Sequence, residues 1–165
     1  MPGPARSGIP YEAVIATPFG RLGVRIEAGT VSEISFLPDD AGLRAPAGAL
    51  ARRVCAQVER YLRDPAFRFD LPLKPAGTEF QRRVWEAISA IPPGGTRGYG
   101  EIARDLGSAP RAVGQACGEN RFPLVIPCHR VISASGIGGF AHAHGGYLLR
   151  IKRWLLAHEA SSVGR

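Results

Sequence analysis

One stretch of the chain sets a thiol beside an imidazole and a guanidinium. Residues 124–132 read LVIPCHRVI, with apolar and partly β-branched runs on both sides of Cys128, His129 and Arg130. Such runs are typical of buried backbone that holds one position. A cysteine in this company favours a nucleophile hypothesis, but most free cysteines are simply small buried hydrophobes. Both interpretations stay open for Cys128 until the surrounding elements are considered.

A second candidate for chemistry is the loop that follows. Residues 133–146 read SASGIGGFAHAHGG, and five glycines among 14 residues give a backbone that can lie against a ligand. We therefore expect this loop to line a pocket beside Cys128. His142 and His144 have a spacing that suits a metal, but no third ligand accompanies them, so solvated loop histidines are the favoured interpretation.

The elements that must position these residues begin with a helix after residue 77. Thr78 and Gln81 are spaced for a capping box, in which each side chain bonds the backbone of the other residue. An apolar stripe at helical spacing then runs along the helix, through Phe80, Val84, Ile88 and Ile91. Residues 92–95, PPGG, end the helix.

Residues 99–120 predict a helix-turn-helix. A short helix over 99–107 is closed by glycine, and after Ser108-Ala109-Pro110 a second helix covers 111–120. The second helix exposes Ala, Gly and Gln with one cation, Arg111, at its start. Small side chains and one inserted arginine suit the minor groove and displacement of a base better than reading of the major groove. A Gly/Ala helix packed tightly on the core is the alternative.

The last predicted helix covers residues 147–158. It buries leucine and isoleucine side chains and is expected to present Arg150, Lys152 and Arg153 to solvent on the other face. Glu159, at its end, comes within possible reach of the reactive segment.

The first 75 residues are predicted to form a support domain with no chemical site. Short apolar runs at 12–16, 22–27 and 31–36 predict an antiparallel meander, and helical spacing over 50–62 predicts a helix. A boundary at 75–77, PAG, separates this domain from residues 76–165. The expected fold class is α+β, with a small sheet domain followed by a mostly helical one.

Composition points to a polyanionic partner. The formal charge is +7 and comes almost entirely from arginine, with 10 basic and 8 acidic residues in 1–75 against 11 and 6 in 76–165. Nucleic acid is the leading candidate for a basic, arginine-rich half. Three irregularly spaced cysteines favour free thiols in a reducing compartment, and no stretch is long and apolar enough to span a bilayer. We expect a location in the cytoplasm, or in the nucleus of a eukaryotic cell.

Several motifs together resemble one family, the O6-alkylguanine-DNA alkyltransferases, also called methylated-DNA–protein-cysteine methyltransferases. In order along residues 76–159 they are Gly77-Thr78-x-Phe80-Gln81-x-x-Val84-Trp85, Ile91-Pro92-x-Gly94, Tyr99-Gly100-x-Ile102-Ala103, Arg111-Ala112-Val113-Gly114, Asn120, Ile126-Pro127-Cys128-His129-Arg130-Val131-Ile132 and Leu155-Leu156-x-x-Glu159. The Pro-Cys-His-Arg motif with its flanks is highly specific.

The resemblance implies roles for the reactive residues. Cys128 would displace the alkyl group from guanine O6 and keep it as a thioether, so that each molecule acts once. Adjacent side chains on an extended chain point apart, and the family pattern places a water between Cys128 and His129. Glu159 would orient the imidazole, and Asn120 would brace the turn before the reactive segment.

The resemblance also implies a partner, which is duplex DNA carrying O6-alkylguanine, with O4-alkylthymine as a further substrate. Arg111 would replace the flipped nucleotide in the stack, and Tyr99 would crowd the backbone beside it. Further DNA contacts are expected at Ala112, Gly114, Gln115 and Arg130, and an alkyl pocket at Phe140, Ala141 and Val131. We expect a monomer with no cofactor and no metal, since residues 1–75 have one cysteine and no histidine to bind a structural zinc ion.

Two departures and two alternatives accompany this resemblance. The spacing from Tyr99 to Arg111 is shorter than the family pattern, and the loop over 136–147 is longer. One alternative is an alkyltransferase-like protein that binds the lesion without repairing it, against which the presence of Cys128 argues. The other is a Cys-His hydrolase, which would leave the helix-turn-helix unexplained.

Overall fold

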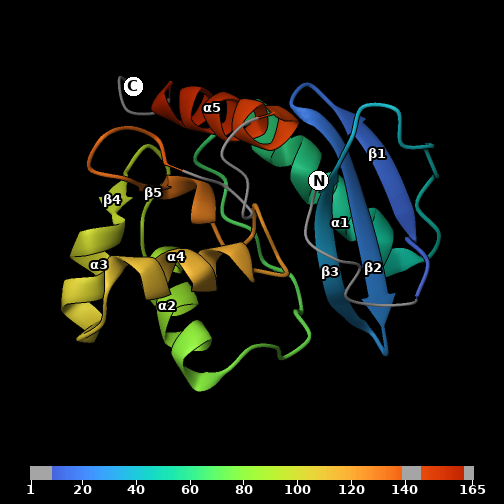
Figure 1. The fold of residues 1–165 in the computed structure, drawn as a ribbon. Helices are drawn as coiled ribbons and strands as arrows, with labels where there is room; N and C mark the ends of the chain where they lie inside the picture. The colour runs from blue at the N-terminus through green and yellow to red at the C-terminus, as the bar shows by residue number, and fades with distance from the viewer. Residues whose placement is uncertain (1–8, 139–145, 162–165) are drawn as a thin grey trace.

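The computed structural model describes residues 9–138 and 146–161 and has α+β architecture (Figure 1). Strands β1 (Ala13–Thr17), β2 (Gly20–Glu27) and β3 (Thr30–Leu37) form an antiparallel sheet in the order β1-β2-β3. The tight turn between β2 and β3 places Ala28 and Gly29 at φ 48° and 76°. Positive φ at both central residues matches the right-handed twist of the paired strands. The predicted meander is therefore confirmed.

Helix α1 (Ala49–Arg63) covers one face of this sheet, as Figure 1 shows. Its buried residues, Ala51, Val54, Val58 and Tyr61, recur at the spacing of one helical face. The chain then returns along the sheet, because Val31 N–H donates to Pro72 O and Lys74 N–H donates to Val31 O, both at 2.8 Å. The sheet and the segment bonded to it therefore form one layer, and α1 forms a second layer against it.

Helix α2 (Glu79–Ser89) begins with the predicted capping box. Gln81 N–H donates to Thr78 Oγ1 at 3.1 Å, and Thr78 N–H donates to Gln81 Oε1 at 2.9 Å. The indole N–H of Trp85 donates to Ala116 O at 2.8 Å, which ties α2 to the second helix of the helix-turn-helix.

The helix-turn-helix consists of α3 (Tyr99–Leu106) and α4 (Pro110–Gly118). Gly107 ends α3 in the left-handed region, at φ 64°, as glycine at this position predicts. Helix α4 ends two residues earlier than expected, and Asn120 lies beyond it. The strand pair β4 (Arg97–Gly98) and β5 (Val131–Ile132) runs parallel and joins the start of α3 to the reactive segment.

Helix α5 (Gly146–Ala160) lies across the top of Figure 1, over both the sheet side and the helical side. One buried hydrophobic cluster includes side chains from both predicted domains, for example Phe36 and Val58 with Ile88 and Leu155. A backbone bond also joins them, since Ile34 N–H of β3 donates to Arg121 O at 2.9 Å. The predicted boundary at residues 75–77 stays a prediction.

Among the helices of the described ranges, none combines the length and apolar character needed to cross a membrane. Within the same ranges, no three His, Cys, Asp or Glu side chains gather where they could hold a metal ion.

Candidate active site

The reactive segment is a single turn of 3-10 helix, η1 (Cys128–Arg130). This corrects the expectation of extended backbone around Cys128. Arg130 N–H donates to Pro127 O at 2.9 Å and closes the turn. Successive side chains in such a turn diverge by about 120°, because it has three residues per turn. Cys128 and His129 therefore still point in different directions, as they would on a strand.

Cys128 is 4% exposed, and its thiol is held by the amide of Asn120, which lies two residues beyond the end of α4. Asn120 Nδ2 donates to Cys128 Sγ at 3.2 Å and to Ile126 O at 2.9 Å. Phe122 N–H donates to Asn120 Oδ1 at 2.9 Å. One side chain thus fixes the turn after α4, the backbone before η1 and the sulfur atom together.

The environment of Cys128 keeps the sulfur protonated in the resting protein. A hydrogen bond with Cys117 and burial raise the pKa of the Cys128 thiol well above its ordinary value. The Asn120 amide and the Lys152 cation act in the opposite direction. Attack by this sulfur therefore needs a base that accepts its proton during the reaction.

A buried carboxylate, Glu159 of α5, gathers the neighbouring groups. His129 Nε2 lies 2.6 Å from Glu159 Oε2, and Arg130 Nε donates to Glu159 Oε1 at 2.7 Å. Arg130 Nη1 also donates to Ile91 O at 2.6 Å. Burial alone would raise the pKa of Glu159, but the hydrogen bonds and charges of His129 and Arg130 bring it down to about 2. Glu159 is therefore ionised at neutral pH.

His129 is fully buried, and its surroundings favour the neutral ring, which can accept a proton. Burial lowers its pKa despite the opposing effect of Glu159, and the nearby Arg130 and Lys152 cations lower it further. The ring is neutral at pH 7, and because ionised Glu159 only accepts, the bond between them assigns the ring proton to Nε2. Nδ1 is then an acceptor, and it has no hydrogen-bond partner among the described residues.

Tyr61 of α1 also reaches this carboxylate, which sequence reasoning missed. Its hydroxyl donates to Glu159 Oε2 at 2.6 Å, and both side chains are buried. The expectation that residues 1–75 contribute no chemical group to the site is therefore wrong. The available signal was a tyrosine on the buried stripe of an amphipathic helix, since a buried phenol needs a partner.

Lys152 is a second residue that the structure places differently from the prediction. It was expected to face water, but it is 0% exposed. Its Nζ donates to Val131 O at 2.8 Å and also to Ile137 O, and it lies 5.9 Å from the centroid of the Tyr99 ring. Burial lowers its pKa to about 8. Its position could have been read from the sequence, because residue 152 follows Leu148 by four positions and precedes Leu155 by three, on the buried stripe.

The predicted DNA contacts fall into two groups. Along α4, Arg111 and Gln115 are exposed, whereas Ala112 and Gly114 are half-buried, and Tyr99 is half-buried at the start of α3. A Cβ added at Gly114 would meet no atom within 4 Å, so this face of α4 is open in the free protein.

Arg130 does not belong with these residues. It is 7% exposed and bonded to Glu159 and to Ile91 O, so its side chain is not presented on the surface of the free protein, and its contact with DNA stays a prediction. Val131, expected to line the alkyl pocket, has a side chain that is fully buried in the core. Its carbonyl oxygen accepts a hydrogen bond from Lys152. Phe140 and Ala141, with His142 and His144, lie outside the described residues.

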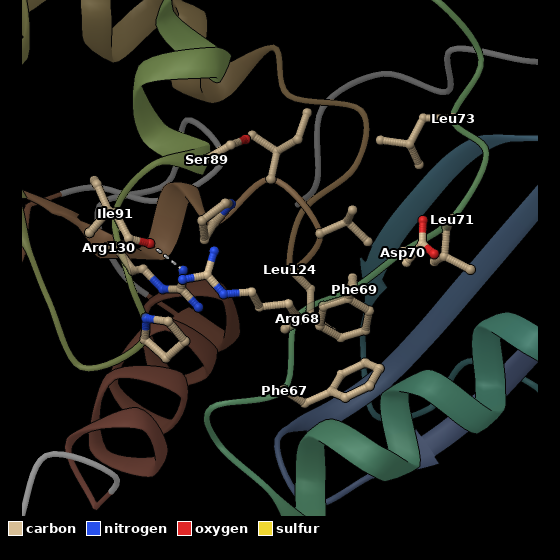
Figure 2. Close-up of a pocket in the computed structure, with 14 residues that line it drawn as sticks. Phe67, Arg68, Phe69, Asp70, Leu71, Leu73, Ser89, Ile91, Leu124 and Arg130 are labelled. Atoms are coloured by element: carbon tan, nitrogen blue, oxygen red, sulfur yellow. Dashed lines mark hydrogen bonds between the residues drawn. The ribbon is translucent and has the colours of Figure 1, made fainter.

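A cavity of about 330 Å³ lies on another side of the reactive segment (Figure 2). Its walls come from residues 67–71, from 124–127, and from Leu73, Ser89, Ile91, Pro93 and Arg130. Figure 2 shows Phe67 and Phe69 on one side and the bond from Arg130 to Ile91 on the other. Neither Cys128 nor Tyr99 lines it, so it is separate from the space in which the thiol would meet a substrate.

Comparison with known proteins identifies relatives of this chain. Residues 79–161 match the family model of the 6-O-methylguanine DNA methyltransferase DNA binding domain. A methylated-DNA–protein-cysteine methyltransferase from Methanosarcina acetivorans is 36% identical over 92% of this chain and 99% of its own length. One from Mycolicibacterium paratuberculosis is 49% identical over 70% of this chain and 66% of its own.

Solved structures agree with the sequence relatives. The O6-methylguanine methyltransferase of Mycobacterium tuberculosis superimposes with a TM-score of 0.75 and 35% identity, covering 90% of this chain and 91% of that protein. A structure from the same organism in complex with DNA also gives a TM-score of 0.75, at 36% identity. The predicted α+β fold class is thereby confirmed. With a family model matched over half of its residues and a relative matched almost end to end, this chain belongs to the 6-O-methylguanine DNA methyltransferase family.

Proposed function

We infer that this protein is a methylated-DNA–protein-cysteine methyltransferase, which repairs DNA by direct reversal, and we propose that Cys128 is its acceptor. The observation that carries the proposal is the arrangement of the buried Cys128, His129 and Glu159 with the half-buried Asn120 beside the helix-turn-helix. The substrate would be an O6-alkylguanine turned out of duplex DNA. O4-alkylthymine is a further candidate with the same leaving-group chemistry.

The transfer is a displacement at the alkyl carbon. The thiol proton passes to His129 Nδ1, through the intervening water that the family resemblance implies, and Sγ forms a bond to carbon. The bond between that carbon and O6 breaks, and its electron pair stays with the base. The base takes up a proton at N1 to become guanine, and His129 gives up the proton it took from the thiol, so the reaction balances. The products are a thioether on Cys128 and an unmodified base, so the protein is consumed by one reaction.

The residues around Nδ1 support this assignment of base and acceptor. Glu159 holds the proton of the resting imidazole on Nε2 and stabilises the imidazolium formed when Nδ1 accepts a second proton. Asn120 and Lys152 favour the thiolate as it develops. No cofactor is needed for these steps, because the leaving group comes from the substrate and the nucleophile from the chain.

Helix α4 would bring the base to this site. Its exposed Arg111 and Gln115 and its small residues Ala112 and Gly114 suit close approach to a groove, with Arg111 taking the place of the extruded nucleotide. Tyr99 would crowd the backbone at the flipped position. The excess of basic side chains would contribute a salt-dependent attraction to phosphates.

The experiment that tests this proposal is intact-mass measurement after incubation with a duplex containing one O6-methylguanine. We expect one added methyl group, mapped to Cys128, and none in Cys128→Ala. Cys55→Ala, a half-buried thiol on α1, is the matched control and should still gain the methyl group. Unmodified protein that nevertheless retains the damaged duplex would contradict transfer and favour the lesion-binding alternative.

A further inference from the structure

The hydroxyl of Tyr61 shares a single carboxylate oxygen with the base. Glu159 Oε2 accepts from Tyr61 at 2.6 Å and lies 2.6 Å from His129 Nε2. All three side chains are at most 1% exposed, so water does not compete for these bonds. Tyr61 comes from α1 and the other two residues from the opposite end of the chain, which makes the contact independent of local sequence.

We propose that Tyr61 is a positioning residue for alkyl transfer, which acts through Glu159 to keep His129 a neutral base. The inference rests on the proposed function, because it assigns a role in the same proton transfer. Tyr61 touches neither the sulfur nor the base of the DNA in this role, and its effect passes through one carboxylate.

The physical reason lies in how an oxygen divides its electron density among its donors, which are Tyr61, His129 and, at 3.1 Å, Arg130 Nη2. A phenol that donates to Oε2 takes up part of the negative charge, so this oxygen attracts the Nε2 proton of His129 less strongly. The carboxylate still orients the ring, but it favours protonation of the ring less, so His129 stays neutral before the reaction. Without the hydroxyl, Glu159 would hold imidazolium more firmly, and fewer molecules would have a free Nδ1 at a given pH.

The position of the hydroxyl is fixed by neighbours on both sides. His158 Nε2 lies 2.8 Å from the backbone carbonyl oxygen of Tyr61, and the two rings meet edge to face with centroids 5.0 Å apart. Phe69 packs against the Tyr61 ring, with centroids 5.6 Å apart, and Trp154 stacks on His158 at 4.8 Å. Burial and the adjacent Glu159 charge raise the pKa of Tyr61, so the hydroxyl remains a donor throughout the physiological range.

The test is the pH dependence of single-turnover methyl transfer from an O6-methylguanine duplex in Tyr61→Phe. We expect the midpoint of the acidic limb to move up by about one pH unit, which is roughly a tenfold slower reaction on that limb, with a smaller change on the alkaline plateau. NMR titration of the His129 ring in the same variant should give a pKa raised by a similar amount.

Val58→Ala is the matched control, because it removes buried side-chain volume from the same face of α1 and leaves the hydroxyl in place. Its acidic midpoint should equal that of the wild type even though the protein is less stable. Replacement of Tyr61 by 3-fluorotyrosine provides a second variant that keeps the shape and strengthens the donor. Its midpoint should move down, opposite to Tyr61→Phe.

Unchanged midpoints in Tyr61→Phe and in the fluorotyrosine protein, with normal methylation of Cys128, would overturn the role of Tyr61 and leave the proposed function standing. A shift of equal size in Val58→Ala would also overturn it, because loosening of the fold would then explain the change. Failure of the wild type to take up a methyl group would instead overturn the proposed function. If Tyr61→Phe does not fold, the fluorotyrosine protein decides the matter.

Discussion

At the scale of single residues, Glu159 is where the polar part of the site converges. It accepts from a tyrosine and an arginine and bonds a histidine, in a region where the charge is buried. A buried carboxylate remains ionised only when such partners compensate for lost hydration. Because the partners come from α1 and η1 and Glu159 itself from α5, the ionisation of one group is coupled to the correct folding of three elements.

This coupling predicts a loss of stability in acid. The folded-state pKa of His129 lies below 6.5, so below about pH 6.5 the unfolded chain binds a proton that the folded protein does not. The folded-state pKa of Glu159 is about 2 against an ordinary 4.5, so the same holds between those values. The free energy of unfolding should fall from about pH 6.5 downward and most steeply between 4.5 and 2.

Urea denaturation of the wild type and of Glu159→Gln at a series of pH values checks this. The variant should be less stable at pH 7 by about 3–5 kcal/mol, because Arg130 loses its buried counter-charge. Its stability should also depend less on pH between 4.5 and 2. Parallel curves for the two proteins over that range would contradict the role of Glu159.

The residues of the site differ in how well the sequence predicted them. Cys128, His129 and Asn120 belong to a motif of local spacing, so they could be named before the fold was known. Lys152 was misplaced, because a cation is assigned to solvent by default although its spacing is that of the buried stripe. For Tyr61 the buried stripe indicated only that the phenol needs a partner, and the partner could not be identified because Glu159 lies 98 positions away.

At the scale of elements, α4 combines a buried face with an open face of small side chains. Val113 and Ala116 are buried, and Trp85 anchors the helix through Ala116 O, while the space beside Gly114 is empty. The glycine that closes α3 and the turn after it predicted this helix pair well, although α4 begins at Pro110, one residue before the predicted start. Its last turn was predicted less well, because the chain leaves α4 to let Asn120 reach the thiol.

Gly114→Ala tests whether the open face of α4 meets DNA. The added methyl group has room in the free protein, and replacing a helical glycine should increase stability by roughly 0.5–1 kcal/mol. If this surface approaches DNA closely, the same methyl group should weaken binding of duplex DNA by about tenfold. Reaction with free O6-benzylguanine, which needs no duplex, should be almost unchanged.

Gly100→Ala is the matched control, because Gly100 is an exposed glycine of α3 that also has no atom within 4 Å of an added Cβ. It should leave duplex affinity close to that of the wild type in a fluorescence-anisotropy titration. Equal affinities for Gly114→Ala, Gly100→Ala and wild type would show that α4 does not approach DNA in this way.

At the scale of the whole molecule, the two predicted domains share one core. The bond from Ile34 to Arg121 and the contact of Phe19 with Trp154, whose ring centroids are 5.4 Å apart, connect the sheet directly to the helical part. The sequence indicated the sheet and the helices separately, through their different periods. It could not show that they pack as one body, because those contacts join residues far apart in the chain.

We expect the chain to unfold in one cooperative transition because of this shared core. Tryptophan fluorescence reports on Trp85 and Trp154, whereas far-UV circular dichroism reports on the backbone of all elements. The two signals should give the same denaturant midpoint. Separate midpoints would indicate that the sheet part and the helical part unfold independently.

The burial of the thiol has one more consequence, which concerns the fate of the spent molecule. Cys128 is 4% exposed and its sulfur accepts a hydrogen bond from Asn120, so the atom that receives the alkyl group lies in closely packed surroundings. A thioether there must displace close neighbours and cannot donate a hydrogen bond, and overpacking of this kind costs about 1–3 kcal/mol. We therefore expect the alkylated protein to have a lower thermal stability than the unreacted protein, so that a melting experiment distinguishes the two.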